Sequence, residues 1–261
     1  MPEHLIDVDG GYLTAFTYGS GPAVLFLHGW ALDQRMWASQ LRLAASGCTI
    51  ITVDRRGFGT STAPPNINLE VDDIRRLLDT LGFESAALVG MSQGGRVALR
   101  FACAWPRRVD QLALQGAPVD GFPSAPSHNE AIPIAHYRRL LQNGEQKRFV
   151  EEWCAHPLVA PDMKLMPRIM QPLVAGYEGR DLLHGAPDAY TGDVYGQMAA
   201  LPVQTLYLYG EQDIPWLRSV AVTLPAVWRK VLAVEIKGAG HFANITKSDD
   251  YNAALVRFLG H

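Results

Sequence analysis

Long apolar runs and an excess of charge of one sign are both missing from this chain of 261 residues. Its longest apolar stretches are four to seven residues, which is too short to cross a bilayer. The 23 basic and 26 acidic residues leave a net charge of −3 and form no basic stripe. Neither nucleic acid nor an anionic membrane is therefore an expected partner.

Cysteine is also scarce, and the three present are Cys48, Cys103 and Cys154. They lie far apart without the spacing of a metal site, and free cysteine usually packs as a small hydrophobe. We expect three reduced thiols and no bound metal or cofactor. The residues after Met1 have neither the basic region nor the apolar core of a signal peptide, so a cytoplasmic location is expected.

What the chain does contain is an alternation of strand-like and helix-like segments. Strands are expected at residues 12–18, 23–27, 49–53, 86–89, 111–115, 204–209 and 231–236, several of them apolar without alternation, as in strands covered on both faces. Helices are expected at 68–81, 94–104 and 250–259, the first capped by Asn68 and ended by Gly82. This order predicts an α/β fold with a parallel sheet between helices.

The alternation stops between residues 118 and 199. Helical patches recur there at 136–142, 146–154 and 164–176, with several prolines and no convincing strand. A surface loop of this length without structure of its own would be unusual in a compact domain. We therefore predict a helical lid at 118–199, inserted into a core formed by residues 1–117 and 200–261.

The strongest chemical signal is the sequence GMSQG at residues 90–94, between an expected strand and an expected helix. A sharp strand-to-helix turn exposes the serine Oγ, and the two glycines leave room for that strained turn. The pattern alone occurs by chance, but the strand and helix around it favour a functional role. Ser92 is the predicted nucleophile, which needs a neighbouring base.

The sequence His28-Gly29-Trp30 follows the expected strand at 23–27. A loop in this place can direct backbone N–H groups at a reacting carbonyl. We expect the N–H groups of Trp30 and Gln93 to form an oxyanion hole. His28 is interpreted mainly as a structural histidine that bonds nearby backbone, and it is also a candidate for contact with substrate.

His241 is the predicted base, because it follows Gly240 in a loop after a strand and near the last helix. In open α/β sheets, ligands bind and react at the carboxyl ends of the strands. Asp213, a few residues past the expected strand at 204–209, is the preferred acid to orient the imidazole and stabilise its charge. Glu211 and Asp120 also follow strands and stay open as alternatives.

Residues 54–61, which read DRRGFGTS, add a further motif. With the GMSQG and His-Gly sequences and the order Ser92, Asp213, His241, they make the chain similar to the α/β-hydrolase superfamily over nearly its whole length. The resemblance implies a mostly parallel eight-stranded sheet. It also implies a structural role for residues 54–61, with glycines in a tight turn and an arginine that fixes loops.

Two shorter segments resemble particular branches of that superfamily. Residues 28–30 look like the oxyanion loop of the pimeloyl-carrier methyl esterases. Residues 149–153 and 156–158 are similar to the lids of those esterases and of the menaquinone-pathway SHCHC synthase. The resemblance implies a small-molecule substrate that contacts Trp153 and Leu158, with an acyl-carrier protein as a further candidate partner and a monomer or dimer as the assembly.

The sequence thus predicts a serine hydrolase that cleaves an ester, thioester or lactone through an acyl-enzyme. A serine at residue 92 argues against haloalkane dehalogenases and epoxide hydrolases, which use an aspartate there. Three alternatives stay open with the same residues: hydrolysis of a carbon–carbon bond, a base-triggered elimination, and a ligand receptor with slow turnover.

Overall fold

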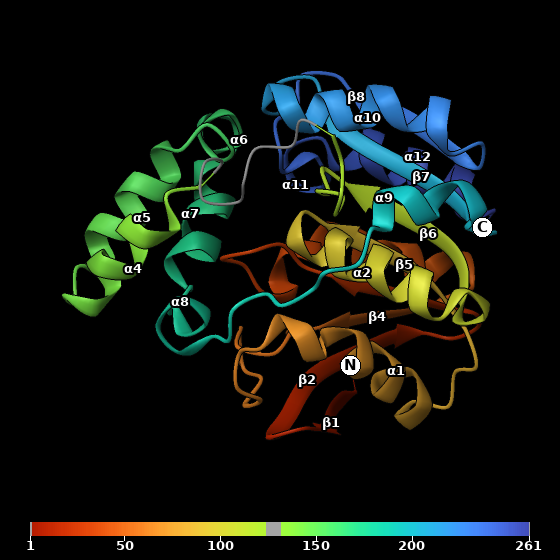
Figure 1. Ribbon diagram of the computed structural model, residues 1–261, viewed down its shortest axis with the longest axis horizontal. Helices are drawn as coiled ribbons and strands as arrows, with labels where there is room; N and C mark the ends of the chain where they lie inside the picture. Colours follow the sequence, from red (N-terminus) through yellow and green to blue (C-terminus); the bar gives the residue numbers. More distant parts are fainter. Residues whose placement is uncertain (1, 124–131, 261) are drawn as a thin grey trace.

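Eight strands form one sheet in the computed structural model, which describes residues 2–123 and 132–260 (Figure 1). The strands are β1 (Glu3–Val8), β2 (Gly11–Gly19), β3 (Ala23–Leu27), β4 (Thr49–Val53), β5 (Ala86–Met91), β6 (Val109–Gln115), β7 (Gln204–Gly210) and β8 (Val231–Ile236). Their order is β1-β2-β4-β3-β5-β6-β7-β8. β2 is antiparallel to β1 and β4, and all other neighbours are parallel. The predicted fold class is confirmed.

Parallel pairing brings the carboxyl ends of the central strands to one edge of the sheet. Leu27 at the end of β3 lies opposite Gly90 of β5, and Met91 lies opposite Gln115 at the end of β6. Gln115 also pairs with Leu208 of β7. The loops that follow these four strands therefore start side by side, where open α/β sheets bind their ligands.

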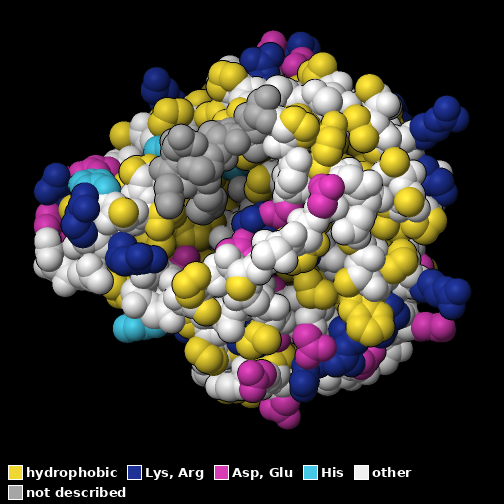
Figure 2. Space-filling model, viewed as in Figure 1, with side chains coloured by type: hydrophobic (Ala, Val, Ile, Leu, Met, Phe, Trp, Pro, Cys, Tyr) yellow, Lys and Arg dark blue, Asp and Glu magenta, His cyan; other side chains and the backbone are white. Residues whose placement is uncertain are grey.

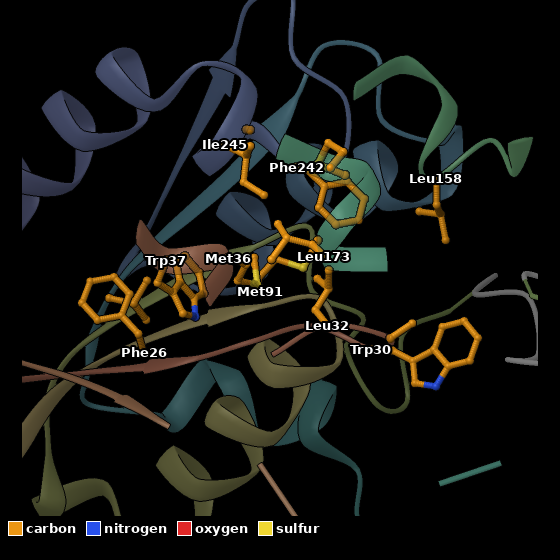
Figure 3. Close-up of a cluster of buried hydrophobic side chains, with 14 of the residues drawn as sticks. Phe26, Trp30, Leu32, Met36, Trp37, Met91, Leu158, Leu173, Phe242 and Ile245 are labelled. Carbon is orange, nitrogen blue, oxygen red and sulfur yellow. The ribbon is translucent and has the colours of Figure 1, made fainter. Parts of the chain in front are cut away.

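Helices cover both faces of the sheet, and each face has its own hydrophobic core (Figure 1). The helices of the sheet domain are η1 (Gln34–Ser46), η2 (Ile67–Leu69), α1 (Glu70–Thr80), α2 (Gln93–Ala104), η3 (Pro106–Arg108), α10 (Pro215–Val227), α11 (Ala243–Thr246) and α12 (Ser248–Leu259). Phe26 of β3 belongs to the core with η1, α11 and α12, whereas Leu25 belongs to the core with α1, α2 and α10. Figure 3 shows Phe26 beside Trp37 of η1, with ring centroids 5.1 Å apart.

The helix expected at 68–81 starts differently from the prediction. Asn66, in an extended conformation, is the capping residue, and its side chain accepts from the Asn68 N–H at the start of η2. The prediction that Asn68 caps the helix is therefore wrong, because Asn68 already lies inside this turn. Its side chain instead donates to the Pro187 carbonyl and accepts from the Ala189 N–H. Gly82, at φ 77°, follows the end of α1 as expected.

The segment between β6 and β7 is helical in its described part, and residues 124–131 of the predicted lid lie outside the described residues. Its helices are α4 (Ile134–Gln142), α5 (Gln146–Ala155), α6 (Ala160–Leu165), α7 (Pro167–Ala175), α8 (Arg180–His184), α9 (Val194–Gln197) and η4 (Met198–Ala200). We call α4–α8 the lid. Figure 1 shows α4, α5, α7 and α8 beside the sheet domain, whereas α9 packs against α2. The single helix expected at 164–176 is divided, because a residue before proline, here Met166 before Pro167, disfavours the helical conformation.

None of the helices in the described residues is both long and apolar enough to span a membrane. Cys48, Cys103 and Cys154 are free thiols, as predicted. Burial raises the pKa of Cys103 to about 11, so this cysteine is protonated at neutral pH.

A buried ion pair joins α1 to the loop after β4. Arg56 Nε lies 2.5 Å from Asp73 Oδ2, and the two side chains are 0% and 6% exposed. Arg56 also donates to the Pro64 carbonyl at 3.0 Å. Because neither charge reaches water, each depends on the other, and loss of one partner is far more costly than loss of both.

We predict that Asp73→Leu lowers the free energy of unfolding by about 3–5 kcal/mol, since it leaves Arg56 charged and unpaired in the interior. The double variant Arg56→Met/Asp73→Leu should recover most of that loss. Urea unfolding followed by circular dichroism measures both. Equal losses in the single and double variants would contradict the expected dependence of each charge on the other.

Candidate active site

Ser92 forms the turn between β5 and α2 in a strained conformation. Its φ is 51° and its ψ is −119°, and Ala31 at φ 58° is the other non-glycine residue with positive φ in the described chain. Such conformations cost about 1–3 kcal/mol each and persist only where the surroundings fix them. The Ser92 N–H donates to the Gln115 carbonyl at 2.8 Å, and the Ser92 carbonyl accepts from the Arg96 N–H at 2.9 Å.

Glycines around Ser92 allow three backbones to touch. A Cβ atom on Gly90 would lie 2.5 Å from Gly95 Cα, and one on Gly94 would lie 2.4 Å from the carbonyl oxygens of Leu27 and His28. Real Cβ contacts are not this short, so only glycine fits at either position. The ends of β3 and β5 and the start of α2 are therefore held in direct contact, which leaves the Ser92 side chain beyond the end of the sheet.

His241 and Asp213 contact each other through their side chains. His241 Nδ1 is 2.8 Å from Asp213 Oδ2, and the two side chains are 4% and 1% exposed. The other Asp213 oxygen accepts from the Ile214 N–H at 2.8 Å. A Cβ atom on Gly116, at φ 50°, would lie 2.8 Å from His241 Nδ1. Only glycine, which has no side chain, therefore fits beside the imidazole ring at this position. With Nδ1 bonded to the carboxylate, Nε2 is the nitrogen left to receive a proton.

Gln115, which precedes Gly116, connects the loops of Ser92 and His241. Its carbonyl accepts from Ser92, and its side-chain amide donates to the His241 carbonyl at 2.9 Å and to Asn244 Oδ1 at 3.0 Å. Gln115 is not among the site residues predicted from the sequence. The available signal was an amide side chain at the end of an apolar strand that is otherwise buried.

The two amides expected to bind an oxyanion lie on either side of Ser92. Gln93 is the first residue of α2, where N–H groups have no partner within the helix. Within residues 2–123 and 132–260, no acceptor bonds to the Trp30 N–H. A Cβ atom on the neighbouring Gly29 would lie 3.5 Å from Ser92 Cβ, which shows how near this loop comes to the serine.

A cavity of about 310 Å³ opens next to Ser92, Gln93 and Trp30. The face drawn in Figure 2 is hollowed between the lid and the sheet domain. The rest of the cavity lining is mainly apolar and comes from Arg96, Pro118, Val119, Asp120, Gly121, Phe122, Ile132, Leu158, Trp216 and Leu217. The serine and the two amides thus face a space that can hold a small organic molecule.

Comparison with known proteins agrees with this architecture. Residues 22–248 match the family described as the alpha/beta hydrolase fold. The chain belongs to this family. It is 26% identical over 255 residues to the AB hydrolase superfamily protein YisY of Bacillus subtilis, covering 92% of each chain.

Two solved structures show the same fold as this alpha/beta hydrolase. An esterase from Exiguobacterium antarcticum superposes with a TM-score of 0.82 at 21% identity, covering 100% of both chains. MenH from S. aureus superposes with a TM-score of 0.80 at 21% identity, covering 94% of this chain and 97% of that one. At this identity, the comparison describes the fold alone.

The two alternative acids of this hydrolase lie away from the imidazole. Asp120 accepts from Arg96 Nε and Arg100 Nε, each at 2.7 Å. Glu211 accepts from the Gly238 N–H at 2.9 Å. Asp213 is therefore the carboxylate that the fold brings to His241, whereas Asp120 lines the cavity as the partner of two arginines.

His28 is buried, and both of its ring nitrogens are bonded within the protein. Nε2 accepts from the Arg55 N–H at 3.0 Å, so Nδ1 carries the hydrogen and donates to the Gly29 carbonyl at 2.8 Å. Burial, together with the Arg55 charge, lowers the pKa of His28 to about 3, which keeps the ring neutral. His28 does not line the cavity, which fits the structural interpretation and not contact with substrate.

Arg55 joins the loop at residues 28–30, which carries the expected oxyanion donor Trp30, to the start of α2. Its guanidinium donates to the His28 carbonyl at 2.8 Å and to Gln93 Oε1 at 2.7 Å, and it forms a buried ion pair with Glu70. This is the loop-fixing arginine that the family resemblance implies. It bonds Gln93, one of the two expected oxyanion donors, and His28, which lies two residues before the other, Trp30.

Residues of the lid bond and pack against the Trp30 side chain. Trp30 Nε1 donates to Asp181 Oδ2 at 2.7 Å, and the Tyr177 hydroxyl donates to the other oxygen of Asp181 at 2.5 Å. Trp153 packs against Trp30 with ring centroids 4.9 Å apart and does not line the cavity, whereas Leu158 does. Figure 3 shows Trp30 and Leu158 on the same side of a cluster of buried side chains to which both belong. Of the two lid residues expected to contact substrate, the structure thus places only Leu158 at the cavity.

We predict that Asp213→Asn lowers kcat by about 10⁴-fold, because an amide cannot hold the His241 tautomer or stabilise its charge. Asp120→Asn should lower kcat far less, since Asp120 bonds arginines and not the imidazole. Hydrolysis of a p-nitrophenyl ester by the two purified variants measures the order of the effects. A larger loss in the Asp120 variant would show that the acid is not Asp213.

Proposed function

We propose that this protein hydrolyses small carboxylic esters, thioesters or lactones through an acyl-enzyme on Ser92. The observation that carries the proposal is the buried His241–Asp213 pair, 2.8 Å apart, in a loop that Gln115 joins to the turn of Ser92. The half-buried Ser92 lies with Gln93 and Trp30 at one cavity. An imidazole oriented in this way can activate a serine that would otherwise be a poor nucleophile.

The proposed reaction has two similar halves. His241 Nε2 takes the Ser92 proton as Oγ attacks the substrate carbonyl carbon, and the tetrahedral oxyanion is bound by the N–H groups of Trp30 and Gln93. One such donor contributes about 3 kcal/mol to transition-state stabilisation. The imidazolium then gives its proton to the leaving oxygen or sulfur, and the carbon–oxygen or carbon–sulfur bond breaks. Water, activated by His241, releases the acid and restores Ser92.

The cavity supports a substrate of modest size and little charge. Its volume of about 310 Å³ lies at the lower end of the range for ligand sites, and most of its lining is apolar. The charged groups at its wall, Arg96 and Asp120, are paired with each other. A short or medium apolar acyl group fits these surroundings.

Ser92, His241 and Asp213 could also serve three other functions, which the experiments below would reveal if no ester is hydrolysed. Hydrolysis of a carbon–carbon bond, an elimination, or slow turnover by a ligand receptor would each use the same serine and imidazole. A small-molecule substrate, a cytoplasmic location, a monomer or dimer, and an acyl-carrier protein as a further partner stay predictions from the sequence.

The first test uses Ser92→Ala with p-nitrophenyl esters from acetate to decanoate. Loss of the nucleophile should lower turnover by about 10⁶-fold. Intact-mass measurement after treatment with a fluorophosphonate should show one added group on the wild type and none on the variant. Retention of more than about a hundredth of the wild-type rate by a pure variant would exclude Ser92 as nucleophile.

A second test concerns the acyl chain. Leu158→Trp should reduce kcat/KM for decanoate by at least about tenfold relative to acetate, because the larger ring fills the cavity. Leu165→Trp is the matched control, since Leu165 is also a lid leucine but is 50% exposed. An unchanged chain-length profile in the Leu158 variant would show that acyl chains bind elsewhere.

A further inference from the structure

A fully buried carboxylate from the lid lies against the loop that carries His241. Asp162, on α6, is 0% exposed. One of its oxygens accepts from the Gly240 N–H and the other from the Phe242 N–H, each at 3.0 Å. These are the amides of the two residues that flank His241, so one side chain holds the backbone on both sides of the imidazole.

Two further contacts tighten this arrangement. The Thr246 hydroxyl donates to Asp162 Oδ1 at 2.7 Å. A Cβ atom on Gly240 would lie 2.3 Å from Asp162 Oδ2, so glycine is needed for the carboxylate to come this close. The glycine before His241 therefore makes room for a residue 78 positions earlier in the chain.

The bonding pattern suits an ionised carboxylate. Two of the three partners of Asp162 are backbone N–H groups, which can only donate, and the Thr246 hydroxyl also donates to the carboxylate. Burial raises the pKa of Asp162, while the three hydrogen bonds and the attraction of His241 oppose that rise. A buried carboxylate is costly unless several donors satisfy it, and here the donors come from the His241 loop and α11.

We propose that Asp162 is a positioning residue that fixes the place of His241 relative to Ser92 and makes the lid part of the catalytic centre. The proposal rests on the function proposed above for His241. Asp213 sets the orientation of the ring through Nδ1, whereas Asp162 and Gln115 hold the backbone from which the ring extends. A displacement of about 1 Å in a catalytic group can reduce rate about 100-fold, so this backbone restraint has a direct effect on turnover.

The chain contains a matched control for the chemistry of Asp162. Asp54, also buried, accepts from the backbone N–H groups of Gln34 and Thr60 at 2.9 and 2.8 Å, and from the Thr60 hydroxyl at 3.0 Å. It is 3% exposed, and burial raises the pKa of this carboxyl group too. Asp54 thus has the same bonds in a loop that carries none of Ser92, Asp213 and His241.

The experiment compares Asp162→Asn with Asp54→Asn. Both variants place an amide against backbone N–H groups and should lose thermal stability. Asp162→Asn should lower kcat by about 100-fold with KM changed by less than about threefold, because the base is displaced while the cavity is intact, and Asp54→Asn should lower kcat far less. The low-field proton resonance of His241 Nδ1–H should shift or broaden in Asp162→Asn and stay unchanged in Asp54→Asn.

Three results would overturn the proposal. One is a kcat within about threefold of wild type together with an unchanged resonance in Asp162→Asn. This result would mean that Asp162 only attaches the lid to the sheet domain and does not position His241. Another is an equal loss of kcat in both variants. The third is a resonance that changes equally in both. If Asp162→Asn does not fold, Asp162→Ala, which removes the opposed amide, supports the same measurements. The resonance needs no substrate, so it decides the positioning role even if the wild type hydrolyses no ester.

Discussion

A single residue, Ser92, separates the end of β5 from the start of α2, and it makes this turn with a positive φ. The conformation persists because the backbones of β3, β5 and α2 touch at Gly90 and Gly94, which leaves the chain no room to relax. The register of the sheet then places Gln115 beside the turn, where its carbonyl accepts the Ser92 N–H. The position of the His241 loop is tied to this contact, because Gln115 also bonds that loop.

Long-range polar contacts give these loops the rigidity that loop backbone lacks by itself. Arg55 joins the loop at residues 28–30 to α2, Asp181 of the lid bonds the Trp30 indole, and Asp162 of the lid bonds the amides around His241. Arg55 and Asp162 are buried and Asp181 is half-buried, and burial of a charged group is favourable only when several hydrogen bonds satisfy it. The lid is therefore joined through two carboxylates to the loop of Trp30 and to the loop of His241.

The fold and the meeting of His241 with Asp213 could be predicted because their signals are local. Parallel strands bring their carboxyl ends together, so residues just after strands converge wherever they lie in the sequence. Gln115, Asp162 and Asp181 could not be found in this way, since a single carboxylate or amide has no motif and its partner lies up to 151 residues away. The break before Pro167 was readable from its proline, whereas the choice between Asn66 and Asn68 as cap depended on backbone conformation.

The contacts of Asp162 and Asp181 constrain how such an enzyme can evolve. A lid that is joined to the core only by surface packing could be exchanged between relatives as a module. Here an exchanged lid without carboxylates at these positions would leave the Gly240 and Phe242 amides and the Trp30 indole without their acceptors. Side chains such as that of Leu158, which lines the cavity through apolar contact alone, can be replaced without leaving a hydrogen-bond donor unpaired. Selection for a new substrate would therefore proceed through single replacements inside the existing lid, and recombination of whole lids would be selected against.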